Sequence, residues 1–323
     1  MIDALAQILG FFLDFIFNFV YNILPVGSLG ISIIAFTILV RLLMIPLMVK
    51  QQSSLKKMQL IQPELQKIQE KYKNKKDPDS QMQMNIEMRE FYKKNNVSPF
   101  GGCFPLFIQM PIFIALFRVL RSVNTYISKL QELYYDLATQ IVSADGYQQI
   151  LRDVLANNKR ITINKVEETV LSSAEGLQTI LSQVSTNEWS RLSESLGTIS
   201  NNLIEQKNNI EYFFGISLVD SPADLLSQGI TATVLLVVIL FPLLSALTTF
   251  ISSKLISSNQ QQQKNDQAEQ IQKSMNMFLP IMTGMMAFSL PAGLGIYWIV
   301  SNIIQIIQQL AINKFMDKSG EGE

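Results

Sequence analysis

The chain has 323 residues, of which 48% are hydrophobic, and its mean hydropathy is +0.22. These values indicate a polytopic membrane protein with polar segments rather than one soluble domain. Lysine plus arginine and aspartate plus glutamate both number 26, so the charge predicts no direct, sequence-specific nucleic-acid binding. The absence of histidine excludes imidazole proton relays, Ser-His-Asp catalysis and most metal sites, and we expect no metal or other cofactor. The single cysteine, Cys103, excludes an intramolecular disulfide.

Residues 1–26 form an apolar stretch with one polar stripe. Four polar residues fall on one side of a helix: Asp3, Gln7, Asp14 and Asn18. This pattern favours an amphipathic helix in the membrane interface, with a spanning helix as the open alternative. The N-terminus carries Asp3 and lacks the basic region of a signal peptide.

Residues 27–50 are expected to form the first transmembrane helix, in which Arg41 is the only charge before Lys50. At about 1.5 Å of rise per residue, Arg41 lies roughly 13 Å from Lys50, inside a hydrocarbon layer of about 30 Å. An arginine at that depth costs between about 3 and more than 10 kcal/mol, depending on the reference state. Snorkelling and an ion pair are alternatives, but the later spans contain no Asp or Glu. We therefore interpret Arg41 as part of a hydrated functional site.

Residues 51–98 are expected to form a cytoplasmic helical hairpin. From Lys50 to Val97 the chain has 11 basic and 6 acidic residues, and the positive-inside rule places such a segment in the cytoplasm. Apolar residues recur at helical spacing on both sides of the polar segment KNKKDPDS. The pattern predicts two antiparallel arms whose apolar stripes cover one another.

The rest of the chain alternates apolar and polar segments. Residues 99–121 are expected to form the second span, kinked at Pro105 and Pro111. Residues 122–229, with 7 basic and 13 acidic residues, are expected to form an extracellular helical insert without a catalytic constellation. The remaining expected segments are a third span at 230–253, a cytoplasmic loop at 254–274, the fourth and fifth spans within 275–312, and a cytoplasmic tail at 313–323.

Polar residues in the expected spans follow helical spacing rather than being scattered. Each span is predicted to present one polar face toward an interior that the spans share. As the alternative, Ser and Thr hydroxyls can bond to the backbone of their own helix or to a neighbouring helix. The candidate groove residues are Arg41, Thr37, Gln109, Ser245, Thr249, Trp298, Ser301 and Asn302. Together they predict an all-α membrane protein in which five transmembrane helices enclose a positively charged hydrophilic groove.

Three stretches resemble one known family. They are KKMQLIQPELQKIQEKYK with the later MREFYKKNNVSPFGGCFPLFIQMPIFIALFRVL, VRLLMIPL around Arg41, and LPAGLGIYWIVSN near the end. In order and spacing they are similar to the YidC-type membrane protein insertases of the YidC/Oxa/Alb family. The short N-terminal region looks like the shorter bacterial form, and the insert at 122–229 is longer than that form implies.

The resemblance implies a non-enzymatic insertase and chaperone in the bacterial plasma membrane. Arg41 would receive the hydrophilic tail of a nascent membrane protein, whose apolar segment would then enter the lipid. The N-terminus would lie outside and the C-terminus in the cytoplasm. The hairpin lysines would meet the ribosome, the signal-recognition targeting machinery, the Sec translocon or anionic lipids; they are Lys56, Lys57, Lys67, Lys71 and Lys73.

Two other classes of function stay open from the residues alone. A small-solute carrier would use Arg41 as an anion-binding site, but the two halves of the chain show no convincing repeat. A lipid-modifying enzyme would need a nucleophile and a base, and the lack of histidine leaves few options for the base.

Overall fold

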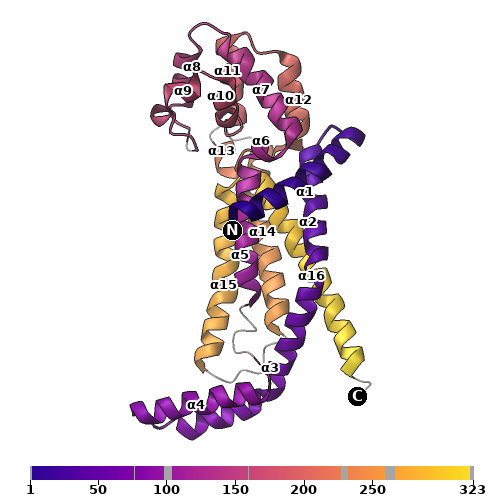
Figure 1. Ribbon diagram of the computed structural model, residues 1–323, viewed down its shortest axis with the longest axis vertical. Coiled ribbons are helices and arrows are strands. Elements are labelled where there is room, and N and C mark those ends of the chain that lie inside the picture. The colour runs from indigo at the N-terminus through magenta and orange to yellow at the C-terminus, as the bar shows by residue number, and fades with distance from the viewer. Residues whose placement is uncertain are drawn as a thin grey trace. The chain divides into compact units, whose positions relative to one another are not determined.

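The computed structural model describes residues 2–75, 77–97, 104–158, 160–226, 232–258 and 266–320, and most of these residues are α-helical (Figure 1). The longer helices are α1 (Ile2–Ile23), α2 (Ser28–Leu43), α3 (Ile45–Tyr72), α4 (Pro78–Lys94), α5 (Phe104–Arg121), α14 (Ala232–Ser258), α15 (Asp266–Ser289) and α16 (Ala292–Gly320). The shorter elements lie between α5 and α14: α6 (Val123–Tyr126), α7 (Ser128–Val142), α8 (Tyr147–Leu155), η1 (Ile163–Lys165), α9 (Glu168–Leu171), α10 (Ala174–Leu181), α11 (Thr186–Leu196), α12 (Asn201–Glu211), β1 (Tyr212–Phe213), β2 (Ile216–Ser217) and α13 (Pro222–Leu226).

The chain divides into two compact units. The insert unit comprises Met1–Leu39, Pro111–Ser245 and Thr283–Val300. The hairpin unit comprises Val40–Met110, Ala246–Met282 and Ser301–Glu323. Several long helices run through both units, so we describe each unit by itself.

The described residues contain three helices that are long and apolar enough to cross a membrane. They are Ile2–Ile23, Val237–Ile256 and Ala292–Phe315, and the consecutive helices Ser28–Leu43 and Ile45–Met58 make a fourth if they form one broken span. The chain is thus an all-α membrane protein, whereas the expected number of five spans stays a prediction. Residues 98–103, at the start of the expected second span, lie outside the described residues, as does Cys103.

The segment expected as one span at 27–50 consists of two helices. α2 ends at Leu43 and α3 begins at Ile45, with Pro46 in the first turn of α3. Proline is tolerated in a first turn because the amide hydrogen it lacks has no partner there, but inside a helix its ring clashes with the preceding turn. α3 then runs on to Tyr72, so the end of the apolar segment and the first hairpin arm share one helix.

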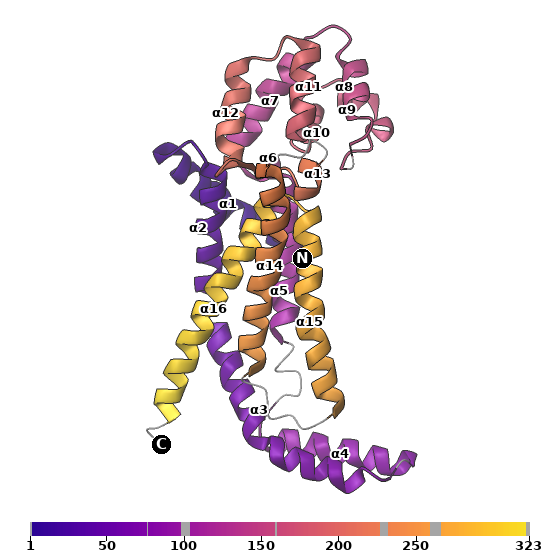
Figure 2. The same ribbon diagram turned by 180° about the vertical axis from the view of Figure 1, so that it is seen from behind.

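The hairpin arms α3 and α4 pack against one another as two antiparallel helices (Figure 2). Leu65 and Tyr72 on α3 are buried. Glu87 on α4 accepts hydrogen bonds from Lys71 Nζ at 2.9 Å and from the Tyr72 hydroxyl at 3.0 Å. The bond to Lys71 is the main reason why the pKa of the Glu87 carboxyl lies below its usual value. Asp77 caps α4 by accepting from the Ser80 amide at 2.8 Å.

The insert unit has its main core around α7. One face of α7 is buried against α6, α10 and α12, and it carries Leu130, Leu133, Tyr134, Leu137, Ala138 and Ile141. These residues repeat at three- and four-residue intervals, as expected for one buried face of a helix. The expected helical insert thus has a hydrophobic core of its own.

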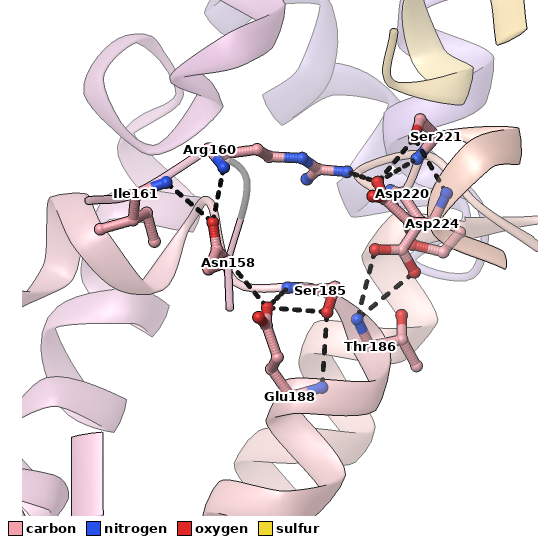
Figure 3. A network of polar contacts seen from close by, with 10 residues as sticks. Asn158, Arg160, Ile161, Ser185, Thr186, Glu188, Asp220, Ser221 and Asp224 are labelled. Carbon is pink, nitrogen blue, oxygen red and sulfur yellow. Dashed lines mark hydrogen bonds and ion pairs between the residues drawn. The ribbon is translucent and has the colours of Figure 1, made fainter. Parts of the chain in front are cut away.

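A polar network holds the connecting segments of the insert together (Figure 3). Ser185 and Glu188 form a capping box at the start of α11, and Glu188 also accepts from Asn158 Nδ2 at 2.8 Å. Arg160 forms an ion pair with Asp224. Burial alone would raise the pKa of the Asp224 carboxyl, but hydrogen bonds from Ser221 and the charge of Arg160 hold the pKa below its usual value.

The insert also encloses a buried ion pair. Lys207 Nζ lies 2.8 Å from Glu211 Oε2, and the two side chains are only 3% and 0% exposed. The Tyr134 hydroxyl donates to the other carboxylate oxygen of Glu211, and Lys207 lies 5.3 Å from the centre of the Trp189 ring. Burial and the neighbouring Glu211 charge raise the pKa of Tyr134 well above its usual value. The sequence predicted a helical insert but not this enclosed charge pair.

Candidate functional site

Arg41 is enclosed by the protein, and two neutral side chains bond to its guanidinium. The residue is 6% exposed. Its Nε donates to the Ser301 hydroxyl at 2.7 Å, and its Nη2 donates to Gln305 Oε1 at 3.3 Å. Ser301 and Gln305 lie one turn apart on α16, so both present their oxygen atoms on the same face of that helix.

The backbone at Arg41 is tied to the same helix. Gln308 Nε2 donates to the Arg41 carbonyl oxygen at 2.9 Å. That carbonyl belongs to the last turn of α2, which ends at Leu43, and the carbonyls of a last turn have no partner in their own helix. The glutamine therefore satisfies a buried backbone acceptor close to the end of α2.

Asn302 extends the polar contacts to α14. Its Nδ2 donates to the Thr249 hydroxyl at 2.9 Å and to the Thr248 hydroxyl at 3.2 Å. Ser301 and Asn302 are neighbours in sequence, so their side chains leave α16 about 100° apart and reach two different helices. One segment of α16 thereby joins α2 and α14 through polar bonds within the hairpin unit.

A second group of amides lies further along α16. Asn313 Oδ1 accepts from Gln52 Nε2 on α3 at 3.2 Å and from Gln309 Nε2 at 2.9 Å. Both glutamines are buried. The polar face of α16 thus continues beyond Arg41 toward the hairpin arms.

The helices around Arg41 supply little negative charge. α2 and α14 contain no Asp or Glu, and α16 contains none before Asp317. The guanidinium bonds to the Ser301 hydroxyl and the Gln305 amide, which accept hydrogen bonds but carry no charge. A substrate carboxylate that approached this group would meet a net positive charge from these helices.

The remaining candidate residues differ in their surroundings. Thr37 and Ser245 belong to the insert unit, and their hydroxyls donate to the Ile33 and Phe241 carbonyls of their own helices at 2.6 and 2.9 Å. Trp298 packs its half-buried ring against Phe113, with the ring centres 5.1 Å apart. The side chain of Gln109 lies outside the described residues.

The hairpin lysines form an open surface. Lys57, Lys67, Lys71 and Lys73 are exposed, and Lys56 is half-buried. Lys71 pairs with Glu87 across the two arms. Its pKa is raised, chiefly by that hydrogen bond.

Sequence reasoning placed Gln305 on the polar stripe of the fifth span without naming it as a groove residue, and it missed Gln308 and Gln309. Gln305, Gln308 and Gln309 follow Ser301 at intervals of four, seven and eight residues, which is the spacing of one helix face. That spacing was the available signal. No sequence signal indicated the hydrogen bond from Gln308 to a backbone carbonyl, because every residue type carries such a carbonyl.

Comparison with known proteins places the chain in a family. The profile of the family described as "60Kd inner membrane protein" matches residues 19–319. The chain is 30% identical over 288 residues to the "Membrane protein insertase YidC" of Oceanobacillus iheyensis, which covers 89% of this chain and 75% of the relative. It is 28% identical over 309 residues to "Membrane protein insertase YidC 1" of Bacillus anthracis, which covers 95% of this chain and 80% of the relative.

A third relative matches more strongly over a shorter stretch. The "Membrane protein insertase YidC" of Fusobacterium nucleatum is 50% identical over 97 residues, which is 30% of this chain and 45% of that protein. The relatives are named as insertases and not as enzymes, in agreement with the expected non-enzymatic class, and the resemblance found in the sequence is confirmed. Because the family profile covers nearly the whole sequence, the chain belongs to the 60Kd inner membrane protein family of bacterial membrane proteins, whose relatives include the YidC insertases.

Proposed function

We propose that this chain is a membrane protein insertase and chaperone that receives the hydrophilic tail of a substrate protein in a positively charged, water-filled groove. The observation that carries the proposal is the enclosed Arg41 guanidinium, held by the neutral Ser301 and Gln305 side chains. The relatives that are named membrane protein insertases support the general function. The groove and its occupant are our inference.

The groove lowers the barrier for moving a tail into the membrane. A carboxylate on the tail gains a charge-assisted hydrogen bond to Arg41, worth roughly 1.5–3 kcal/mol, at a depth where it would otherwise lose its hydration. Neutral hydroxyls and amides next to Arg41, such as Ser301 and Asn302, replace part of the lost hydration of the polar backbone. The tail therefore pauses in a polar environment instead of crossing bare hydrocarbon.

The apolar segment of the substrate provides the driving force for release. Each Leu-like residue contributes about 0.3–0.6 kcal/mol on transfer into a helix in the bilayer, so a segment of about 20 residues supplies several kcal/mol. This transfer needs no nucleotide. The insertase acts by letting the tail and the apolar segment move together.

The proposed topology completes the mechanism. Five transmembrane helices enclose the groove, the N-terminus and the insert lie outside, and the hairpin and the C-terminus lie in the cytoplasm. Thr37, Gln109, Ser245 and Trp298 are proposed to extend the groove wall beyond the described contacts of Arg41. The exposed hairpin lysines are proposed to recruit nascent chains through anionic lipids, the ribosome, targeting machinery or the Sec translocon.

Substitution of Arg41 tests the function. We expect Arg41→Ala to reduce insertion of a single-spanning substrate with an acidic tail by roughly 10- to 100-fold, which corresponds to the loss of about 1.5–3 kcal/mol of pairing. Insertion is measured by protease protection of the tail in proteoliposomes. The matched control is Arg118→Ala, because Arg118 is an exposed arginine that pairs with Asp3 outside this site.

The result is informative only if the variant folds. Equal thermal unfolding midpoints of the two purified variants would show that Arg41→Ala does not act through stability. Unchanged insertion by a folded Arg41→Ala protein would contradict the proposal. Flux of a small anion that depends on Arg41, without any effect on insertion, would favour a solute carrier instead.

A further inference from the structure

The β1–β2 hairpin of the insert presents an aromatic side chain to the surroundings. Phe213 pairs with Ile216, which leaves Phe214 and Gly215 as a two-residue loop. Both loop residues have positive φ, +49° and +76°, as a type I′ turn requires. Phe214 is 89% exposed.

The turn alone does not explain the choice of phenylalanine. Type I′ turns favour Asn-Gly, because asparagine tolerates the left-handed conformation better than residues with bulky side chains. A phenylalanine at this place combines an unfavourable backbone conformation with a side chain that water solvates poorly. The Phe213 ring lies 4.5 Å away between ring centres but leaves Phe214 89% exposed, so a further apolar cover would stabilise this side chain.

The hairpin is seated on the turn between α1 and α2. The Gly27 amide donates to the Asn209 carbonyl oxygen at 2.7 Å, just before the hairpin. A Cβ built on Gly30 would lie 2.4 Å from Phe213 Cγ, so the ring of Phe213 occupies the space that a side chain at position 30 would need. The close fit fixes the hairpin beside the first turn of α2.

The neighbouring surface is also apolar and exposed. Ile23, Leu24 and Val26, which precede α2, are between 48% and 70% exposed. The stretch from Ile23 to Gly30 and the hairpin from Tyr212 to Ser217 contain no charged residue. The exposed residues of these two stretches, Ile23 to Val26 and the hairpin tip at Phe214 and Gly215, form one uncharged apolar surface, which we call the Phe214 patch.

We propose that the Phe214 patch inserts into the interfacial layer of the lipid bilayer and anchors the insert to the membrane surface. The patch is continuous with the start of α2, an apolar helix of a membrane protein, so the lipid that surrounds such a helix also reaches the hairpin. Exposed aromatic side chains at the ends of apolar helices are typical of the membrane interface. A lipid surface thus supplies the apolar cover that Phe214 lacks.

A depth measurement on the full-length protein tests the anchor. In a Cys103→Ser background, Phe214→Cys carries an environment-sensitive nitrobenzoxadiazole probe in vesicles of phosphatidylethanolamine and phosphatidylglycerol. Gln149→Cys, an exposed position on α8 of the same insert, carries the same probe as the control. We expect blue-shifted emission and strong quenching by lipids spin-labelled near the headgroup at position 214, and a water-like, unquenched signal at position 149.

Two results would overturn the proposal. A water-like signal at 214 would show that the patch faces solvent, and a blue shift without quenching by spin-labelled lipid would show that protein covers it. A second measurement removes the influence of the probe. Phe214→Asn keeps a preferred type I′ turn, so amide exchange over residues 212–218 in vesicles should become several-fold faster only if lipid contact protects the hairpin, and Phe214→Trp should restore the slow exchange.

Discussion

Among the residues that the structure describes, two buried cations, Lys207 and Arg41, have different surroundings. Lys207 in the insert lies 2.8 Å from the Glu211 carboxylate, which also accepts from Tyr134. Arg41 in the hairpin unit is bonded to the Ser301 hydroxyl and the Gln305 amide. The first cation meets a full opposite charge, and the described partners of the second are dipoles.

This difference separates a structural charge from one that is available to a ligand. A buried ion pair satisfies both charges, and removing one partner leaves the other uncompensated. Neutral partners orient a guanidinium but preserve its positive field for an incoming carboxylate. We therefore expect the same substitution to change stability by different amounts at the two sites.

The largest effect is expected from Lys207→Met. The substitution leaves Glu211 buried with an unpaired charge, so we expect the insert to lose about 3–5 kcal/mol of unfolding free energy. Denaturant unfolding, monitored by the fluorescence of Trp189, measures this loss of stability, since the Trp189 ring lies beside Lys207. The double variant Lys207→Met with Glu211→Gln should recover part of the loss, and a single variant as stable as the parent would refute the assignment of a structural pair.

The same change at Arg41 provides the matched comparison. Arg41→Met removes a buried cation that is bonded to the neutral Ser301 and Gln305 side chains, so we expect a smaller loss of stability than for Lys207→Met. Insertion should still fall as it does for Arg41→Ala. A loss of stability as large as that of Lys207→Met would erase the distinction between the two sites.

Alkaline pH should destabilise the insert through Tyr134, which donates to Glu211 of the buried ion pair. The folded protein holds the Tyr134 proton at a pKa well above the usual value of 10.0, because burial and Glu211 disfavour the phenolate. Above pH 10 the unfolded chain therefore loses this proton while the folded chain keeps it, and the stability of the insert decreases as the pH rises. In Tyr134→Phe the unfolding free energy should depend less on pH above pH 10. Denaturant unfolding of both proteins at several pH values measures this dependence. An equal dependence in the two proteins would argue against a buried phenol.

Ser301→Ala gives the smallest expected effect and tests hydration. In a dry site, loss of the hydroxyl from Arg41 costs roughly 1.5–3 kcal/mol, because one hydrogen bond to a charged group disappears. In a water-filled groove a water molecule replaces the hydroxyl, and we expect a loss below about 1 kcal/mol. Ser252→Ala, which removes another buried hydroxyl of the hairpin unit, is the control in the same unfolding assay.

The sequence was sufficient to find Arg41, because a charge inside an apolar run is costly wherever the chain folds. Ser301 and Asn302 were found from their periodicity, which fixes the face of a helix on which a residue lies. Thr37 and Ser245 share that periodicity, yet each donates to its own helix backbone. Periodicity indicates the face of a helix but not the acceptor that a hydroxyl selects.

Long-range pairing was beyond the reach of the sequence. Lys207 and Glu211 have the spacing of an ordinary solvated helix pair, and only the packing of α7 and α11 around them makes the pair buried. The β1–β2 hairpin was also missed, because Phe-Gly is an uncommon type I′ turn. In both cases tertiary contacts set a structure that the local sequence does not favour: a buried charge pair, and a type I′ turn at Phe-Gly.

The dependence of insertion on the charge of the substrate tail tests the central claim most directly. Substrates whose tails differ only in the number of aspartates are inserted by the parent protein and by Arg41→Gln, and the yields are compared as a double-mutant cycle. We predict that added aspartates improve capture by the parent protein and that this benefit disappears in Arg41→Gln. An equal benefit in both proteins would contradict the account, because the charge of Arg41 would then play no part in receiving the tail.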